Sequence, residues 1–98
     1  MYGIFRLPAA QASRADVLMK DDLVSRQSIT VRDARSLGVE PEGTLVLVEG
    51  SEAAVARATV LLEGVGTQLQ GAEAQAAYRR FRSQDEDAAM GMGTLFQG

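Results

Sequence analysis

The segment TLVLVE, residues 44–49, carries four apolar residues in succession, Leu45 to Val48. Side chains alternate between the two faces of a strand, so a strand that is apolar at every position is covered on both faces. The run is far shorter than the roughly 20 residues that a membrane-spanning helix requires. We therefore expect a central strand of a sheet, with its second face covered by the same chain or by another molecule.

The neighbouring sequence predicts further short elements around this strand. QSITVRD alternates apolar and polar residues, which is typical of a half-buried antiparallel strand. The other expected strands are Tyr2–Leu7 and Thr67–Leu69. The expected helices are Arg14–Val24 with an N-cap at Ser13, one turn from Asp33 to Leu37 ended by Gly38, a helix capped by Ser51, and Gly71–Arg82. The spacing of Ser83 and Glu86 resembles a capping box that opens one more short helix.

The order of these elements predicts an α+β fold. It best matches a ferredoxin-like βαββαβ sandwich, an antiparallel sheet with helices on one face, followed by a C-terminal helix and an apolar tail. We expect a single domain over residues 1–90 and a tail rich in Gly and Met over residues 91–98.

The residue types limit the chemistry that the chain can perform. Its 98 residues include neither Cys nor His, which removes thiol and imidazole catalysis and the usual zinc sites. We expect a protein that is not an enzyme and holds no cofactor or metal. The first residues have no basic segment followed by an apolar run, so we also expect a cytoplasmic protein with no membrane segment.

A Gly-Ser joint between the apolar strand and the next helix is the first candidate site. The amides of Gly50, Ser51, Glu52 and Ala53 could hold an anion at the start of a helix. The joint lacks the glycine-rich pattern of a phosphate-binding loop, and Glu49 and Glu52 would repel a phosphate. A helix cap formed by Ser51 is the favoured interpretation.

The segment YRRFR is the second candidate. Tyr78, Arg79, Arg80 and Arg82 interleave aromatic and basic character, as nucleic-acid-binding surfaces do. On a helix, Tyr78 and Phe81 share a face and would point into the core, leaving the arginines in solvent. The net charge of −3 means that any positive surface is local.

Two acidic runs complete the charged features. Asp21-Asp22 and Asp85-Glu86-Asp87 lack the alternating spacing of a calcium-binding loop. We interpret both as solvated faces, with Arg82 and Glu86 at the spacing of a helical ion pair.

The tail and the central strand together predict an interface. Exposed Met and other apolar residues give an adaptable surface for docking. The interface residues that we expect are Leu45, Leu47, Met90, Met92, Leu95 and Phe96. The closing LFQG also resembles the recognition sequence of a picornaviral protease that is used to remove affinity tags.

Residues 28–62 resemble the closing half of a KH domain in the segments SITVRD, TLVLVEGS and EAAVARATVLL. This resemblance implies RNA binding through a GxxG loop. The corresponding region, Pro8 to Arg26, contains no glycine. The strand–GS–helix joint is similar as well to those of ferredoxin-like domains and bacterial microcompartment shell subunits.

We expect a small interaction or assembly module that forms a homo-oligomer or binds a protein partner. The alternatives are a nucleic-acid-binding module that uses Arg79, Arg80 and Arg82, and a regulatory domain that binds a small ligand.

Overall fold

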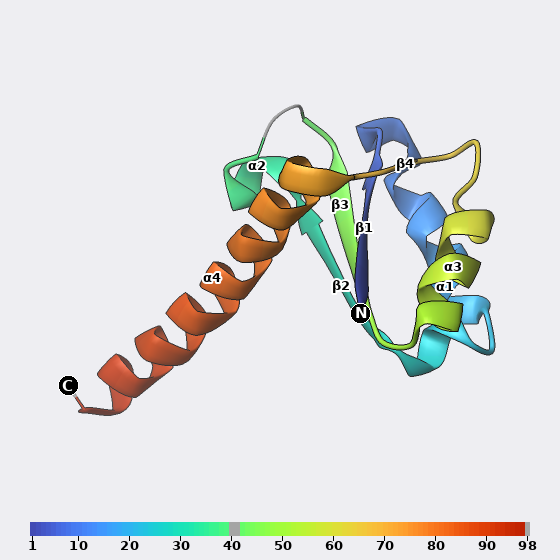
Figure 1. Cartoon of the computed structure of the whole chain (residues 1–98). Coiled ribbons are helices and arrows are strands. Elements are labelled where there is room, and N and C mark those ends of the chain that lie inside the picture. The colour runs from blue at the N-terminus through green and yellow to red at the C-terminus, as the bar shows by residue number, and fades with distance from the viewer. Residues whose placement is uncertain (40–41, 98) are drawn as a thin grey trace.

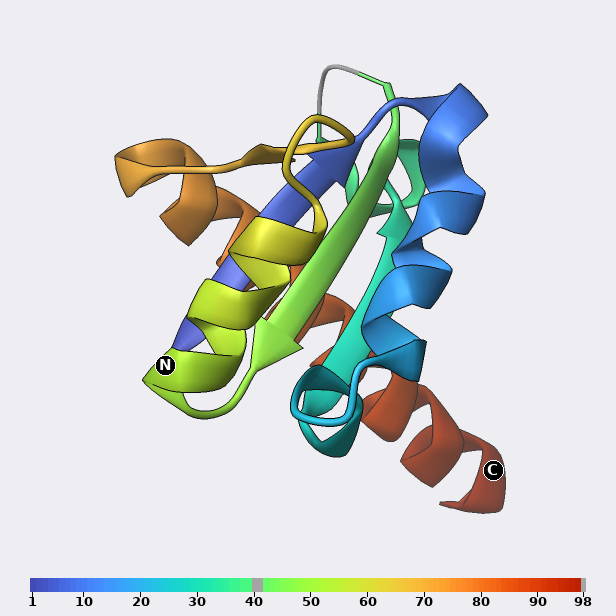
Figure 2. The same cartoon turned by 90° about the vertical axis from the view of Figure 1, so that its right-hand side faces the viewer.

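The computed structural model describes the backbone of residues 1–39 and 42–97, and the side chains of the same residues up to 84. In this part of the chain a four-stranded sheet lies between two groups of helices (Figures 1 and 2). The strands are β1 (Tyr2–Leu7), β2 (Ser28–Asp33), β3 (Thr44–Glu49) and β4 (Thr67–Gln68). The helices are α1 (Asp16–Lys20), α2 (Ala34–Leu37), α3 (Glu52–Leu61) and α4 (Gly71–Gln97), with 3-10 turns η1 (Ala9–Ala15) and η2 (Val24–Arg26).

The sheet is antiparallel throughout, with the strand order β2-β3-β1-β4. β3 lies between β2 and β1, and its Val48 is opposite Ile29 on one side and Gly3 on the other. Leu45 to Val48 are all buried. The predicted central strand and the general α+β class with an antiparallel sheet are therefore confirmed.

One face of the sheet packs against α1, α3 and the 3-10 turns (Figure 2). Phe5, Val46 and Val48 supply the strand side of this core. Ala58 of α3 and Leu62, the residue that directly follows α3, supply the helix side, and their spacing of four positions puts them on one helical face. Val55 of α3 also belongs to this core.

The opposite face packs against α2 and the first turns of α4, which lie on the other side of the sheet (Figure 1). Ile4, Leu45 and Leu47 of the strands pack with Ala77 and Phe81 of α4. The chain therefore covers the second face of β3 with its own helices, at least where the structure describes side chains.

The predicted helix over Arg14–Val24 is wrong in extent. Only Asp16–Lys20 is α-helical, and Ser13 makes no capping hydrogen bond to it. The chain leaves the helix at Asp21, which has an extended backbone. The Asp21 carboxylate then accepts hydrogen bonds from the Leu23 and Val24 amides, which favours a turn in place of further helix.

The connection from β2 to β3 begins with the predicted single turn. α2 spans Ala34–Leu37, and Gly38 follows it with a φ of 72°. A left-handed residue at this position commonly ends a helix, and glycine adopts that conformation without steric cost.

The C-terminal segment is one helix and not two. α4 runs from Gly71 to Gln97, so the predicted new start at Ser83 is wrong. Extending an existing helix costs less than nucleating another, which favours a continuous helix through Ser83. The predicted domain limit at residue 90 stays a prediction.

Candidate functional site

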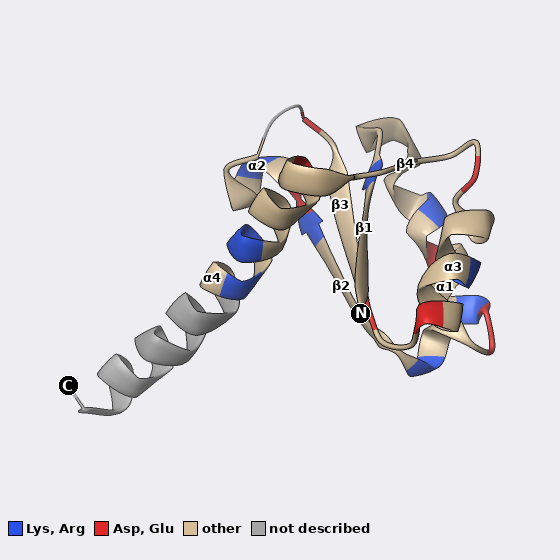
Figure 3. Ribbon diagram, viewed as in Figure 1, with Lys and Arg blue, Asp and Glu red and all other residues tan. Residues whose placement is uncertain are grey.

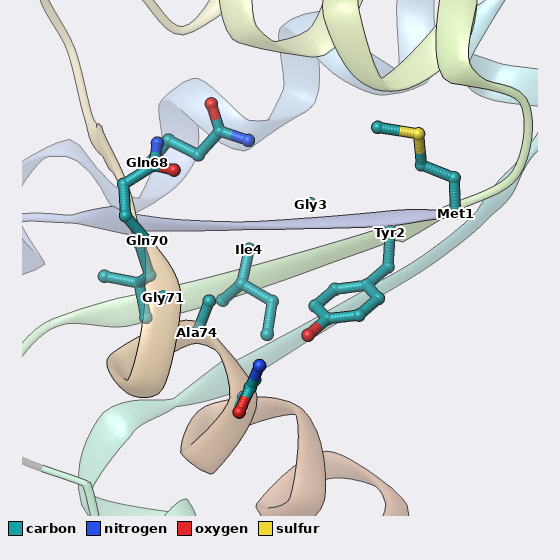
Figure 4. Close-up of a pocket in the computed structure, with 10 residues that line it drawn as sticks. Met1, Tyr2, Gly3, Ile4, Gln68, Gln70, Gly71 and Ala74 are labelled. Carbon is teal, nitrogen blue, oxygen red and sulfur yellow. The ribbon is translucent and has the colours of Figure 1, made fainter.

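An open pocket of about 290 Å³ lies where β1, β4 and the start of α4 meet (Figure 4). Its lining combines apolar groups with three glutamine amides and has no charged side chain among the described residues. The lining residues are Met1, Tyr2, Gly3, Ile4, Gln68, Leu69, Gln70, Gly71, Ala74 and Gln75. Figure 4 shows Tyr2 and Ile4 on the α4 side of β1, with Gln68 and Met1 on the other side. The pocket therefore wraps around the edge of the sheet.

The pocket exists because β4 is only two residues long. β4 pairs with β1 at Phe5 and Arg6, and the Leu69 amide donates one more hydrogen bond of 2.8 Å to the Ile4 carbonyl. The chain then turns into α4 at Gly71, whose φ is 53°. Tyr2 and Gly3 thus lie beyond the end of β4, and the chain that would have covered them has already entered the helix.

A pair of stacked tyrosines borders this pocket. The rings of Tyr2 and Tyr78 are nearly parallel, with centroids 4.1 Å apart. The Tyr78 hydroxyl donates a hydrogen bond of 3.0 Å to Oε2 of Glu49, at the end of β3. This hydrogen bond favours the protonated phenol, and together with burial and the negative charge of Glu49 it raises the pKa of Tyr78 above 10.0.

This stacking separates Tyr78 from the arginines with which the sequence grouped it. Arg79, Arg80 and Arg82 are exposed, whereas Tyr78 is half-buried against Tyr2. The arginine-rich part of α4 lies near α2 and the end of β2, where Figure 3 shows further basic residues. The exposed arginines therefore form a local positive surface. The ring of Tyr78 is not available to stack on a base there, because it stacks on Tyr2.

The Gly-Ser joint is occupied by groups of the chain itself. The Ser51 hydroxyl accepts a hydrogen bond of 3.1 Å from the Ala54 amide, which is the predicted helix cap. The Ser51 amide donates to Oε1 of Gln27 at 3.4 Å. The Gln27 side chain lies so close to Gly50 that a Cβ there would overlap it. The structure thus places Gly50, Ser51, Glu52 and Ala53 at the start of α3. The side chain of Gln27, which the sequence analysis did not connect with this joint, covers it.

The predicted interface residues fall into two groups. Leu45 and Leu47 are buried by the chain's own α2 and α4, so contact with another molecule through them would require α4 to move. Met90, Met92, Leu95 and Phe96 lie in α4, and their side chains are outside the described part of the structure.

Asp21 is a structural residue that the sequence analysis missed, since both aspartates of its run were expected in solvent. Its carboxylate accepts a hydrogen bond of 3.0 Å from Nε of Arg57 on α3, in addition to the Leu23 and Val24 amides. The Val24 amide and the Arg57 guanidinium favour the carboxylate and lower the pKa of Asp21 below 3.8. Asp22, by contrast, is exposed and forms an ion pair with Arg26.

No protein-family model, curated protein or solved structure matches this chain. Within the described residues, no three acidic side chains gather in a group that could hold a metal ion. A search of the same residues finds no helix with the length and apolar character to cross a membrane.

Proposed function

We propose that the protein is a small, non-enzymatic assembly module that acts by homo-oligomerisation. The observation that carries this proposal is the length of α4. Its described core contacts end with Phe81, yet the helix continues to Gln97. Figure 1 shows it running away from the sheet.

A helix normally depends on packing for its stability in water. Short isolated helices are marginal, because the cost of fixing the backbone is recovered mainly when an apolar face is buried. The distal half of α4 contains the apolar residues Met90, Met92, Leu95 and Phe96. A partner that packs on this half would supply the burial that the sheet no longer provides.

The fold that we propose for the body of the protein is a ferredoxin-like βαββαβ sandwich extended by α4. The sheet order β2-β3-β1-β4 supports it. The helical connection from β1 to β2 passes over β3, and the helical connection from β3 to β4 passes over β1, as in a βαββαβ sandwich. The position of α1 and α3 on one face gives further support (Figure 2). In this proposal α2 and α4 are additions that cover the second face.

The experiment is light scattering on the full chain and on a variant with Met92→Lys and Leu95→Lys. We expect an oligomer for the natural sequence and a smaller species for the variant, because two buried charges oppose association. Circular dichroism would serve as the control for folding. A strict monomer at high concentration for the natural sequence would rule out the proposal.

A further inference from the structure

We propose that the outer edge of β2 is a self-association surface, where the β2 strands of two copies pair antiparallel across a two-fold axis at Thr30. The inference rests on the proposed homo-oligomerisation and adds to it a contact surface in the body of the protein. This surface lies within the part of the chain whose side chains the structure describes. The same patch is used on both copies, as in a two-fold symmetric dimer.

The outer edge of β2 is open to another strand. Among the described residues, β2 is the end strand of the order β2-β3-β1-β4. It pairs with β3 in an unbroken register, so no bulge bends it away from a neighbour, and it contains no proline or lysine. These are the features that commonly protect an edge strand from pairing. Every residue of β2 is exposed or partly exposed, so a second strand can reach it.

The outward backbone groups of β2 belong to Ile29, Val31 and Asp33. The Ala34 amide donates a hydrogen bond of 2.8 Å to the Gly43 carbonyl, which continues the β2–β3 register by one pair. Successive residues of a strand direct their backbone groups to opposite edges. The even-numbered residues of β2 therefore bond to β3, and the odd-numbered residues face outward.

Two of the outward carbonyls accept hydrogen bonds from side chains nearby in the sequence. Nη1 of Arg32 donates to the Val31 carbonyl at 2.9 Å, and the Ser36 hydroxyl donates to the Asp33 carbonyl at 2.8 Å. Both donors are exposed side chains, and a carbonyl has a second lone pair. These local contacts leave the backbone of β2 able to bond to another strand.

Exposed apolar side chains occur on the elements at this edge. Five large apolar side chains are exposed among the described residues, and three of them lie on α1, on the turn after it and on β2. They are Met19, Leu23 and Val31, with exposed fractions of 50%, 40% and 36%. Val31 is opposite Val46 of the core beneath α1, and Figure 2 shows α1 on the β2 side of its helical layer. A second copy at this edge would bury apolar surface that the chain itself leaves exposed.

The side chains of β2 are complementary to themselves when Thr30 lies on the axis. Ile29 then exchanges both backbone hydrogen bonds with Val31 of the second copy, and the two apolar side chains lie side by side. Thr30 faces Thr30. Arg32 lies opposite Ser28, which separates the two Arg32 positions by about 14 Å along the strands.

Other centres within the strand place unfavourable pairs opposite each other. A centre at Val31 puts the Asp33 carboxylate beside Ile29, and a centre at Arg32 puts two guanidinium groups directly opposite. A centre at Ile29 pairs Arg32 with Arg26. Centres at the strand ends join fewer residues of β2. The charges and the apolar residues therefore select Thr30.

The proposed contact lies on the side of the body where α4 emerges. Figure 2 shows α4 crossing behind the sheet from the β4 side and continuing beyond β2. A second copy at the β2 edge is therefore on the same side as the distal half of α4, for which the proposed function requires a partner. One dimer would then use both surfaces.

The test uses single cysteines, because the natural chain has none. In a non-hydrogen-bonded antiparallel pair the two Cα atoms are about 4.5 Å apart, a distance that a disulfide spans. Thr30→Cys should therefore form a disulfide-linked dimer under oxidised glutathione, detected by mass spectrometry. Arg32→Cys, on the same face of β2, and Val31→Cys are the matched controls. We expect both to link at least about tenfold more slowly, because their copies are not directly opposite.

A second pair of variants tests the backbone contact by analytical ultracentrifugation. Val31→Pro removes an outward N–H and no β3-facing donor, whereas Val31→Ala shortens the side chain and keeps that N–H. We expect the dimer Kd to rise by about tenfold or more in Val31→Pro and by clearly less in Val31→Ala. Circular dichroism would check folding, since proline is tolerated on edge strands. Equal effects in two folded variants would overturn strand pairing at β2.

The remaining outcomes separate the two proposals. A natural chain that dimerises while none of the three cysteine variants links would overturn the β2 contact and leave homo-oligomerisation through α4 standing. Faster linking at Val31 or Arg32 than at Thr30 would overturn the proposed register. A chain that is monomeric throughout would overturn both proposals.

Discussion

Tyr78 of α4 and Glu49 of β3 are joined by a hydrogen bond of 3.0 Å from the phenol to the carboxylate. This contact links the start of the long helix to the sheet, at the border of the pocket. The ring of Tyr78 is held from its other side by the stacked ring of Tyr2. The position of α4 over the sheet therefore depends on a polar contact as well as on the packing of Phe81.

Removal of the Tyr78 hydroxyl should destabilise the protein. In Tyr78→Phe the Glu49 carboxylate loses a donor, and we expect a loss of about 1 kcal/mol in the free energy of unfolding. Tyr2→Phe is the matched control, since it keeps the stacked ring pair and should change stability by less than about 0.5 kcal/mol. Urea denaturation would measure both values, and equal losses would show that the hydrogen bond contributes nothing specific.

The same contact predicts how stability changes in alkali. The pKa of Tyr78 is raised above 10.0 in the folded state, so the unfolded chain loses its phenolic proton at a lower pH than the folded chain. The contribution is fully present below pH 10 and is lost as the pH rises through the folded pKa. Absorbance titration of the natural protein and of Glu49→Gln should show that the variant lowers the pKa of Tyr78, because the carboxylate that accepts its proton is gone. A pKa of Tyr78 that is the same in the natural protein and in Glu49→Gln would contradict this expectation.

Asp21 should control stability in acid. Its pKa is lowered below 3.8 by the Val24 amide and by Arg57, so its contribution is present above pH 3.8 and is lost as the pH falls through the folded pKa. Asp21→Asn should lower the melting temperature at pH 7 and reduce the fall in melting temperature between pH 5 and 2. Asp22→Asn, at the exposed neighbour, should change stability by less than about 0.5 kcal/mol. Equal melting temperatures for the two variants between pH 5 and 2 would show that Asp21 contributes no more to acid stability than its exposed neighbour.

Ser13 and Ser51, two of the serines that the sequence predicted as helix caps, should differ in their contribution to stability. Ser51→Ala removes the acceptor for the Ala54 amide and should cost about 1 kcal/mol. Ser13→Ala should be nearly neutral, because Ser13 caps no described helix. Thermal unfolding of the two variants at one pH gives a direct comparison, and a larger loss for Ser13→Ala would contradict the assigned helix boundaries.

Phe81 should be the most sensitive position on the second face of the sheet. It is 3% exposed and packs in the cluster that contains Leu45 and Leu47. Phe81→Ala should lower the free energy of unfolding by about 3–5 kcal/mol. Arg82→Ala, at the exposed neighbouring position, should leave the stability of the monomer within about 0.5 kcal/mol. A small loss for Phe81→Ala would mean that α4 does not cover this face in solution.

The elements that were predicted well are those whose signal lies within a few consecutive residues. Leu45 to Val48 define the central strand by composition alone, Ser51 caps the helix that begins beside it, and Gly38 ends the helical turn just before it. Each of these features depends on local backbone preference or on an apolar pattern, so a single sequence contains the necessary information.

The contacts that were missed join residues far apart in the chain. Arg57 reaches Asp21 across 36 positions, and Gln27, which precedes β2, covers Gly50, which follows β3. Tyr78 was correctly expected to point inward, but nothing local indicates that Tyr2 would receive it. The pocket was not predicted either, because it depends on where β4 ends relative to β1. Such features follow from the register of the sheet, which a pattern of apolar residues constrains only loosely.

Sedimentation equilibrium of the full natural chain, over a range of concentrations from micromolar to millimolar, tests the central proposal most directly. The chain has a mass of 10.4 kDa, and we expect a monomer–dimer equilibrium that approaches twice this mass. A folded species that stays at 10.4 kDa at every concentration would contradict assembly through α4.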